Sequence, residues 1–327
     1  MSHLGRAALL LWIPIWASCG AADSGRIPRT NLISGSTGSS WYRIAAAISE
    51  RTNRAFAGQP ITAVPGAGGV SNPARVGLLP GDIGLTFIPF LRAAYRGEAP
   101  YRRSFPDLRH VATLLRNKLH LIVSQSLPIA SLADIKSQRL RVRIGTGPPG
   151  SGEEFLLRES LAVSGISYDD IRSWGGRVEY LGSGERADLF RDYHVDLITF
   201  HAVDPSSLAT ELLLGRPARL LSVPDEVREG LGERWSVRSL TIAAGTYPTQ
   251  ETEVQTVGLE FGFFATADVS PELIYQLVRT TAENKEYLET VHAGFKVWEP
   301  LDMLHNLDVP RHPGAQRYYR ERGWIDQ

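Results

Sequence analysis

The chain has 327 residues, 43% of them hydrophobic and 21% charged, which fits a globular protein of about two domains and excludes disorder or collagen-like arrays. Lysine plus arginine and aspartate plus glutamate both number 35, so the chain lacks the basic excess of nucleic-acid binders, and nucleic acid is not an expected partner. The single cysteine, Cys19, excludes a disulfide framework and a thiolate zinc site within the chain.

Residues 1–22 have the pattern of a signal peptide: a short basic start, an apolar run over 7–17, and small residues after it. The run is shorter than the roughly 20 residues that a membrane-spanning helix needs. Cys19 follows two small residues, as in a bacterial lipoprotein signal, but Trp16 stands where that signal normally has an aliphatic residue. The sequence therefore predicts an exported protein, either cleaved near Ala21 or membrane-anchored through a lipidated Cys19.

Short β-rich runs alternate with helical patterns along the rest of the chain. This alternation predicts the α/β class. The predicted strands are 31–34, 61–64, 83–87, 119–123, 140–144, 195–200 and 219–223. The predicted helices are 41–51, 153–163, 185–193, 205–214 and a long amphipathic helix that runs from Pro271 to Val291, with Ser270 as its cap.

Three glycine-dense turns follow predicted strands and open predicted helices, at 35–42, 65–72 and 145–153. Each places backbone N–H groups and hydroxyls at a helix N-terminus, where the helix dipole favours an anion. The turns therefore indicate a cradle for a carboxylate or another anion. The alternative is that the glycines only make turns and the serines only cap helices.

The third turn also spells G-x-G-x-x-G through Gly145, Gly147 and Gly150, the spacing of a dinucleotide fingerprint. Pro148 and Pro149 lie inside it and have no N–H group to offer a pyrophosphate. No nucleotide cofactor is predicted, and no other cofactor.

Catalytic and metal-binding patterns are not evident in the sequence. No serine lies in G-x-S-x-G, and the eight histidines are dispersed without a metal-ligand spacing, so we expect neither an enzyme nor a metal site. Among the histidines, His201 is expected to reach a cleft because it directly follows the predicted strand 195–200, near Asp204 and Pro205. Trp41 and Tyr42 follow the first glycine turn, where their rings could either face a ligand or pack between helix and sheet.

Taken together, these segments resemble the TAXI family of substrate-binding proteins, the extracytoplasmic receptors of one branch of the TRAP transporters. The likeness runs from about Asn31 to Gly323. Its marks are Ser-Thr-Gly…Trp-Tyr (36–42), Gly-Gly-Val-Ser-Asn (68–72), Gly-Asp-Ile-Gly-Leu (81–85), Pro-Gly-Ser-Gly (149–152), Val-Asp-Leu-Ile (195–198), Gly-Thr-Tyr-Pro (245–248) and His-Pro-Gly-Ala…Tyr-Tyr (312–319).

The resemblance implies a two-lobed periplasmic-binding-protein fold of type II-like form, hinged on strands. Lobe I would contain residues 30–122 plus 258–327, and lobe II residues 123–257. The resemblance also implies a receptor without catalysis, which binds a small carboxylate of the glutamate or 2-oxo acid type and delivers it to a TRAP-type integral membrane permease. The alternative hypothesis is that a protein of the same fold is a membrane-tethered ligand sensor that signals to a partner protein.

By motif, the resemblance also implies the ligand-binding residues. They are Thr37, Gly38, Ser40, Trp41, Tyr42, Gly69, Asn72, Phe87, Ser151, Gly152 and Glu153.

Some positions depart from the family pattern, which usually has serine at Gly69, a polar pair with an aspartate at Ile88 and Pro89, and threonine at Glu153. A carboxylate at position 153 would repel an acid unless it points away or is protonated, and it would suit an amine. It could equally cap the following helix. Arg43 and Arg143 are the cations that could reach a ligand carboxylate, although exposure of both is the stronger expectation.

Overall fold

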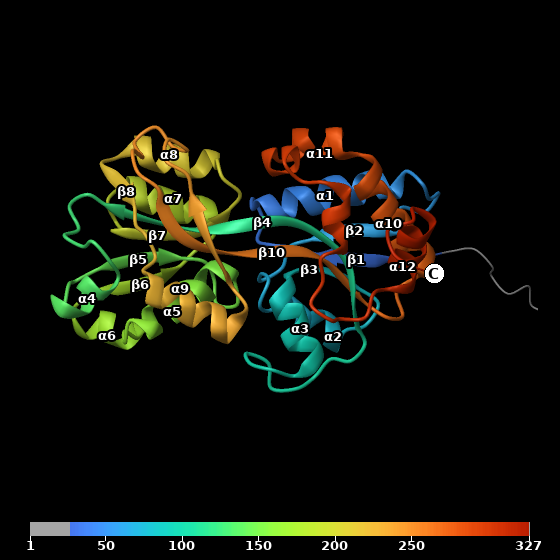
Figure 1. Cartoon of the computed structure of the whole chain (residues 1–327), viewed down its shortest axis with the longest axis horizontal. Helices are drawn as coiled ribbons and strands as arrows, with labels where there is room; N and C mark the ends of the chain where they lie inside the picture. The colour runs from blue at the N-terminus through green and yellow to red at the C-terminus, as the bar shows by residue number, and fades with distance from the viewer. Residues whose placement is uncertain (1–26, 327) are drawn as a thin grey trace, which may run out of the picture.

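The structure is a computed structural model, and it describes residues 27–326. A single mixed sheet of ten strands runs through the molecule in the order β2-β1-β3-β10-β4-β7-β5-β6, with β8 beside β4 and β9 beside β10 (Figure 1). The strands are β1 (Thr30–Ile33), β2 (Ile61–Val64), β3 (Ile83–Phe87), β4 (Leu108–Ser124), β5 (Arg143–Thr146), β6 (Arg177–Tyr180), β7 (Leu197–Ala202), β8 (Ala218–Leu220), β9 (Arg238–Ile242) and β10 (Val254–Thr266).

Helices cover both faces of this sheet in two separate groups, one at each end of the molecule. The first group is α1 (Ser40–Asn53), α2 (Asn72–Leu78), α3 (Ile88–Arg96), α10 (Pro271–Glu283), α11 (Lys285–Val291), the 3₁₀ segments η1 (Ala293–Lys296) and η2 (Pro300–Leu304), and α12 (Pro313–Glu321). The second is α4 (Ala133–Ser137), α5 (Gly152–Val163), α6 (Tyr168–Ser173), α7 (Ser183–Arg191), α8 (Ser207–Gly215) and α9 (Asp225–Trp235).

The two groups define two lobes. Lobe I holds β1–β3 with the first group of helices, and lobe II holds β5–β9 with the second. Within each lobe the outer strands are parallel, as the strand–helix–strand alternation predicts: β1 pairs with β2 and β3, and β5 pairs with β6 and β7.

Two long antiparallel strands, β4 with 17 residues and β10 with 13, lie side by side and pass from one lobe into the other (Figure 1). At one end β10 pairs with β3 of lobe I, and at the other end β4 pairs with β7 and β8 of lobe II. These crossing strands give the α/β, two-lobed architecture that the sequence resemblance implies. The predicted lobe junctions at 122/123 and 257/258 fall inside them, and those residue boundaries stay a prediction.

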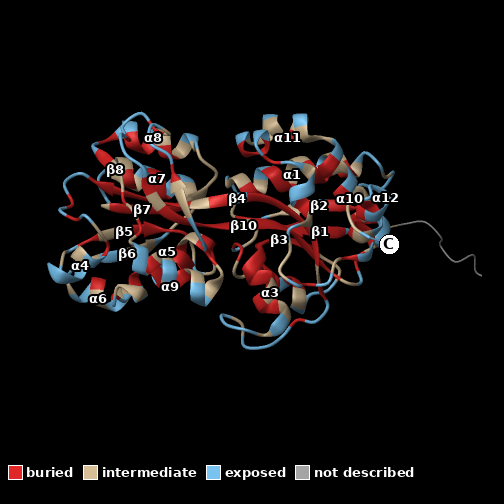
Figure 2. Ribbon diagram, viewed as in Figure 1, coloured by how far each residue is buried: buried red, intermediate tan, exposed pale blue. Residues whose placement is uncertain are grey.

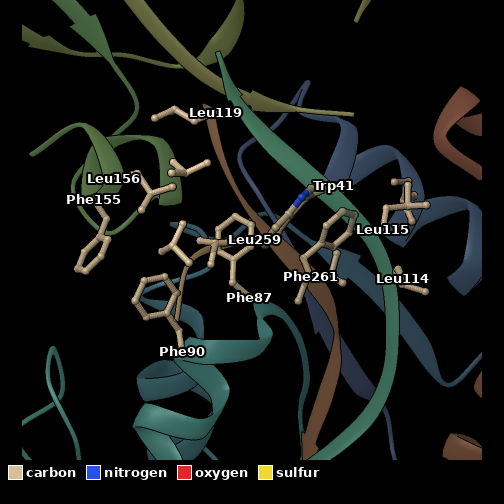
Figure 3. Packing of buried hydrophobic residues seen from close by; sticks show 14 of the residues in the cluster. Trp41, Phe87, Phe90, Leu114, Leu115, Leu119, Phe155, Leu156, Leu259 and Phe261 are labelled. Atoms are coloured by element: carbon tan, nitrogen blue, oxygen red, sulfur yellow. The ribbon is translucent and has the colours of Figure 1, made fainter. Parts of the chain in front are cut away.

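The central strands are buried, whereas β6 and β9 are partly exposed, and the helices present their outer faces to solvent (Figure 2). The largest apolar cluster continues from lobe I through the crossing strands into lobe II. Aromatic rings bridge the lobes within it: Phe90 of α3 meets Phe155 of α5 edge to face at 4.8 Å between ring centroids (Figure 3). Below the crossing strands, the two lobes are therefore in direct apolar contact.

Most predicted elements are confirmed within a few residues, but the long C-terminal helix is not continuous. Ser270 caps α10 by accepting a hydrogen bond from the Leu273 amide at 3.4 Å, as predicted. The helix then ends at Glu283, because Asn284 leaves the helical conformation with φ −126° and ψ 38°. The side-chain amide of Asn284 donates a hydrogen bond to the Thr280 carbonyl at 2.8 Å, and a new helix, α11, begins at Lys285.

Residues 1–22 and Cys19, for which export and lipidation are predicted, lie outside the described residues. Within residues 27–326, no helix has the length and apolarity required to span a bilayer.

Candidate functional site

A cavity of about 480 Å³ lies between the lobes, within the range of small-ligand sites. It is lined by parts of the segments 35–43, 67–69, 148–153, 183–184, 200–208 and 291–293, together with Phe87 and Asn117. Both lobes contribute, and Asn117 adds a residue of the crossing strand β4, so the cavity depends on how the lobes meet.

Four helices begin at this cavity. The first residues of α1, α5, α7 and α8, which are Ser40, Gly152, Ser183 and Ser207, all line it. These helices have 14, 12, 9 and 9 residues, and each directs unpaired backbone N–H groups and the positive end of its dipole toward the site. One N-terminus belongs to lobe I and three belong to lobe II. The arrangement favours a small anion held between the lobes.

Serine hydroxyls cap three of the four helices. Ser39 Oγ accepts from the Tyr42 amide at 3.2 Å, Ser151 Oγ from the Glu154 amide at 3.3 Å, and Ser206 Oγ from the Ala209 amide at 3.4 Å. All three serines line the cavity. Each hydroxyl keeps its own O–H free to donate to a ligand oxygen, so capping and ligand binding are compatible.

The N-terminus of α8 is fixed from behind by a buried pair. The Tyr247 hydroxyl lies 2.7 Å from Nε2 of His120 and accepts from the Ser206 amide at 3.1 Å. Burial lowers the pKa of His120 to about 4, so the ring is neutral near pH 7 and Nε2 accepts from Tyr247. Nδ1 then donates to the Lys118 carbonyl at 3.1 Å.

Of the ligand-binding residues predicted from the sequence, most line the cavity. These are Gly38, Ser40, Trp41, Gly69, Phe87, Ser151, Gly152 and Glu153. Thr37, Tyr42 and Asn72 are not among the lining residues. Asn72 is fully buried, and its Nδ2 donates to the carbonyls of Ser34 and Leu85, both at 2.8 Å, so it ties the end of β1 to β3.

Two of the lining glycines make room for one aromatic ring. A Cβ at Gly69 of lobe I would lie 2.5 Å from Cδ2 of Phe87, and a Cβ at Gly152 of lobe II would overlap the same ring. The ring of Phe87 in turn packs against Trp41 at 4.9 Å, and Trp41 stacks on Phe261 at 4.6 Å (Figure 3). The absence of a side chain at position 69 therefore has a packing reason.

Glu153 does not stand free in the cavity wall. Its Oε1 lies 3.3 Å from Nη2 of Arg186, whose side chain is only 1% exposed. Burial lowers the pKa of the Arg186 guanidinium, and the Glu153 carboxylate opposes that shift. The alternative of a free carboxylate that repels acids is therefore not what the structure shows.

His201 lines the cavity, as its place at the end of a predicted strand indicated. Its ring meets Phe87 edge to face at 5.3 Å. Burial lowers the pKa of His201 to about 4; Glu153 opposes the shift and Arg186 adds to it. Both ring nitrogens are buried without a hydrogen-bond partner among the described residues, so this neutral imidazole has unused hydrogen-bonding capacity beside the cavity.

The two arginines considered as carboxylate partners have different positions. Arg43 is exposed and lines the cavity from α1. Arg143 is not among the lining residues, and its Nε and Nη2 bind the Asp196 carboxylate at 2.9 and 2.5 Å.

Sequence reasoning missed the contributions of α7, α8 and the segment after α11. Ser183, Gly184, Ser206, Ser207 and His292 line the cavity but were not predicted as ligand-binding residues. For α7 and α8 a signal was present, since Ser183 and Gly184 stand directly before the predicted helix 185–193, and Ser206 and Ser207 stand in the first turn of the predicted helix 205–214. His292 carries no such signal.

The two lobes, the two crossing strands and the interlobe cavity define the fold of periplasmic solute-binding proteins. A family model described as the NMT1-like family matches residues 32–323, and the chain belongs to that family. The finer assignment to the TAXI branch stays a prediction.

Solved structures are similar along almost the whole chain. A protein of R. palustris solved with adipate has a TM-score of 0.51 at 18% identity, over 91% of this chain and 94% of that one. MatC from Rhodopseudomonas palustris, solved with bound malate, has a TM-score of 0.54 at 14% identity, over 91% and 98%. The periplasmic binding protein BugD has a TM-score of 0.54 at 13% identity, over 92% and 95%. At these identities the likeness establishes the fold.

Proposed function

We propose that this protein is an extracytoplasmic solute receptor that binds a small organic acid in the interlobe cavity and delivers it to a membrane transporter. The observation that carries the proposal is the convergence of the N-termini of α1, α5, α7 and α8 on one cavity. Four positive helix ends and the capping hydroxyls solvate a carboxylate without any lysine inside the site.

Two further observations support an acid as the ligand. Arg43 adds a cation at the lobe I side of the cavity, and Glu153, the acidic residue among the lining residues, is paired with Arg186. Two proteins of the same fold were solved with adipate and with malate, both dicarboxylates. A cavity of about 480 Å³ has room for an acid of that size.

In finer terms, we propose a receptor of the TAXI type that takes glutamate or a 2-oxo acid and serves a TRAP-type permease, with export directed by residues 1–22 and an optional lipid anchor at Cys19. This part of the proposal rests on the sequence motifs, eight of whose eleven predicted ligand-binding residues line the cavity. In such a receptor a ligand shifts the equilibrium between open and closed lobes only as far as it prefers the closed state.

The experiment is a calorimetric titration of the purified protein against malate, adipate, glutamate, 2-oxoglutarate, acetate and a diamine. A ligand that binds only the native state stabilises it by RT ln(1 + [L]/Kd), about 2.7 kcal/mol at a hundredfold excess over Kd. The melting temperature of the protein should therefore rise with every ligand that binds. We expect at least one dicarboxylate or 2-oxo acid to bind and the diamine to fail. Binding of the diamine alone would contradict the proposal.

A further inference from the structure

Glu153 and Arg186 form an ion pair at the wall of the cavity. Glu153 lies in the first turn of α5 and Arg186 in α7, 33 positions further along the chain. Glu153 lines the cavity with a side chain 19% exposed, whereas Arg186 is 1% exposed and lies behind it, outside the set of lining residues. The carboxylate therefore separates the guanidinium from the ligand space.

Two glycines, Gly145 of β5 and Gly147 of the loop that follows it, give this pair its room. A Cβ at Gly147 would lie 2.6 Å from Oε1 and 2.7 Å from Cγ of Glu153. A Cβ at Gly145 would lie 3.1 Å from Cγ of Arg186. The G-x-G spacing that imitates a dinucleotide fingerprint thus has another role: it lets the Glu153 side chain fold back against the loop, toward Arg186.

Among the residues that line the cavity, Glu153 has the one acidic side chain. Without compensation, its charge would oppose an acid held by the N-termini of α5 and α7, because like charges at close range repel each other. Buried ion pairs contribute little net stability, so stability does not explain the buried guanidinium of Arg186. Cancelling the charge of Glu153 does explain it.

We propose that Arg186 is a positioning residue for ligand selection, which holds the Glu153 carboxylate back over Gly147 and cancels its charge so that the cavity admits acids. The inference rests on the proposed function of this site and deepens it. Arg186 does not touch the ligand; it acts through Glu153. Loss of the guanidinium should convert Glu153 into a free cavity carboxylate, which repels acids and attracts amines.

The test is a double-mutant cycle of Arg186→Met, Glu153→Gln and the two together, titrated with the tightest acid found for the wild type. We expect Arg186→Met to weaken acid binding about tenfold or more, which corresponds to about 1.4 kcal/mol. Glu153→Gln should not weaken it, and the double variant should bind within a few-fold of the wild type. Arg143→Met is the matched control, because Arg143 pairs with Asp196 away from the cavity and should leave affinity unchanged.

The double variant also carries the test by itself if Arg186→Met does not fold, since it leaves no unpaired buried charge. Acid binding weakened tenfold or more in the folded double variant would mean that Arg186 acts independently of Glu153, and would overturn the inference.

A diamine titration separates this inference from the proposed function. If the wild type binds no acid in the panel, the proposed function fails, and the pair is judged by the diamine alone. Diamine binding gained in Arg186→Met but not in the double variant would still support the inference. If Arg186→Met gains no diamine binding in that case, both the proposed function and the inference are overturned.

Discussion

The backbone amide of Val70 in lobe I donates a hydrogen bond to the carbonyl of Gly150 in lobe II, at 3.1 Å. The amide of Ser71 shares the same acceptor at 3.3 Å. Gly150 has φ +89°, and a Cβ on it would overlap Oγ of Ser71. This loop-to-loop contact joins the lobes beside the cavity.

We predict that Gly150→Ala shifts the protein toward an open arrangement, because the new methyl group cannot fit against Ser71 while the lobes touch. Ligand affinity should fall, and small-angle X-ray scattering should give a larger radius of gyration at saturating acid than for the wild type. Gly245→Ala is the matched control: Gly245 also has a positive φ, +73°, but has no atom within 4 Å of the added Cβ. Equal effects of the two substitutions would assign the change to backbone strain instead.

A charge placed at a helix N-terminus tests the anion cradle directly. We predict that Ser207→Asp, at the first residue of α8, lowers affinity for acids about tenfold, because the added carboxylate occupies the positive helix end and repels the ligand. Ser207→Asn has nearly the same shape without the charge and should have a small effect. The measurement is calorimetry for both variants. Equal affinities in the Asp and Asn variants would be incompatible with an anion at this helix.

Asn72 should behave as a structural residue. Asn72→Ala removes two donors from the buried carbonyls of Ser34 and Leu85, and an unpaired buried polar group costs about 1–3 kcal/mol. We predict a loss of that order in the free energy of unfolding, measured by urea denaturation. Ser151→Ala, at the cavity, should instead weaken ligand binding by more than it lowers stability. If Asn72→Ala left stability unchanged and abolished binding, the resemblance would have assigned its role correctly.

Stability should fall as the solution becomes acidic. Burial lowers the pKa values of His120, His201 and His312 to about 4 and that of His110 to about 3, below the ordinary value of 6.5. Between pH 6.5 and about 4 the unfolded chain takes up protons that the native state excludes, so the free energy of unfolding decreases there and is unaffected by these groups above pH 6.5.

His120 gives this prediction a specific measurement. A buried histidine whose pKa falls from 6.5 to about 4 on folding lowers the free energy of unfolding at pH 5 by about 2 kcal/mol relative to pH 7. In urea denaturation, His120→Gln should lose less stability between pH 7 and pH 5 than the wild type does, even though its stability at pH 7 is lower because it changes the bond to Tyr247. The exposed His194 provides the control, and His194→Gln should keep the wild-type pH dependence. An identical slope in all three proteins would refute the prediction.

Local signals in the sequence determined the class of the fold and the places where helices begin. The alternation of strands and helices predicted the α/β class, and Ser270 predicted the start of α10 because a cap acts within three residues. The glycine turns at 35–42 and 145–153 likewise predicted two of the four helix ends at the cavity. Where tertiary contacts decide, these signals fail: β4 was predicted as 119–123 but spans Leu108–Ser124, because pairing with β10 extends it across both lobes.

Only the tertiary structure decided what Glu153 and Asn72 do. The sequence alone left three roles open for Glu153: a group that repels acids, a partner for an amine, or a helix cap. Its actual partner, Arg186, lies 33 positions further along the chain, and no local sequence pattern indicates that the two side chains pair. Asn72 belongs to a binding motif by resemblance, but its side chain bonds to the carbonyls of Ser34, at the end of β1, and of Leu85 within β3. The physical reason is one of range: capping and periodicity act over a few residues, whereas charge pairing and buried hydrogen bonds depend on which distant segments the packing brings together.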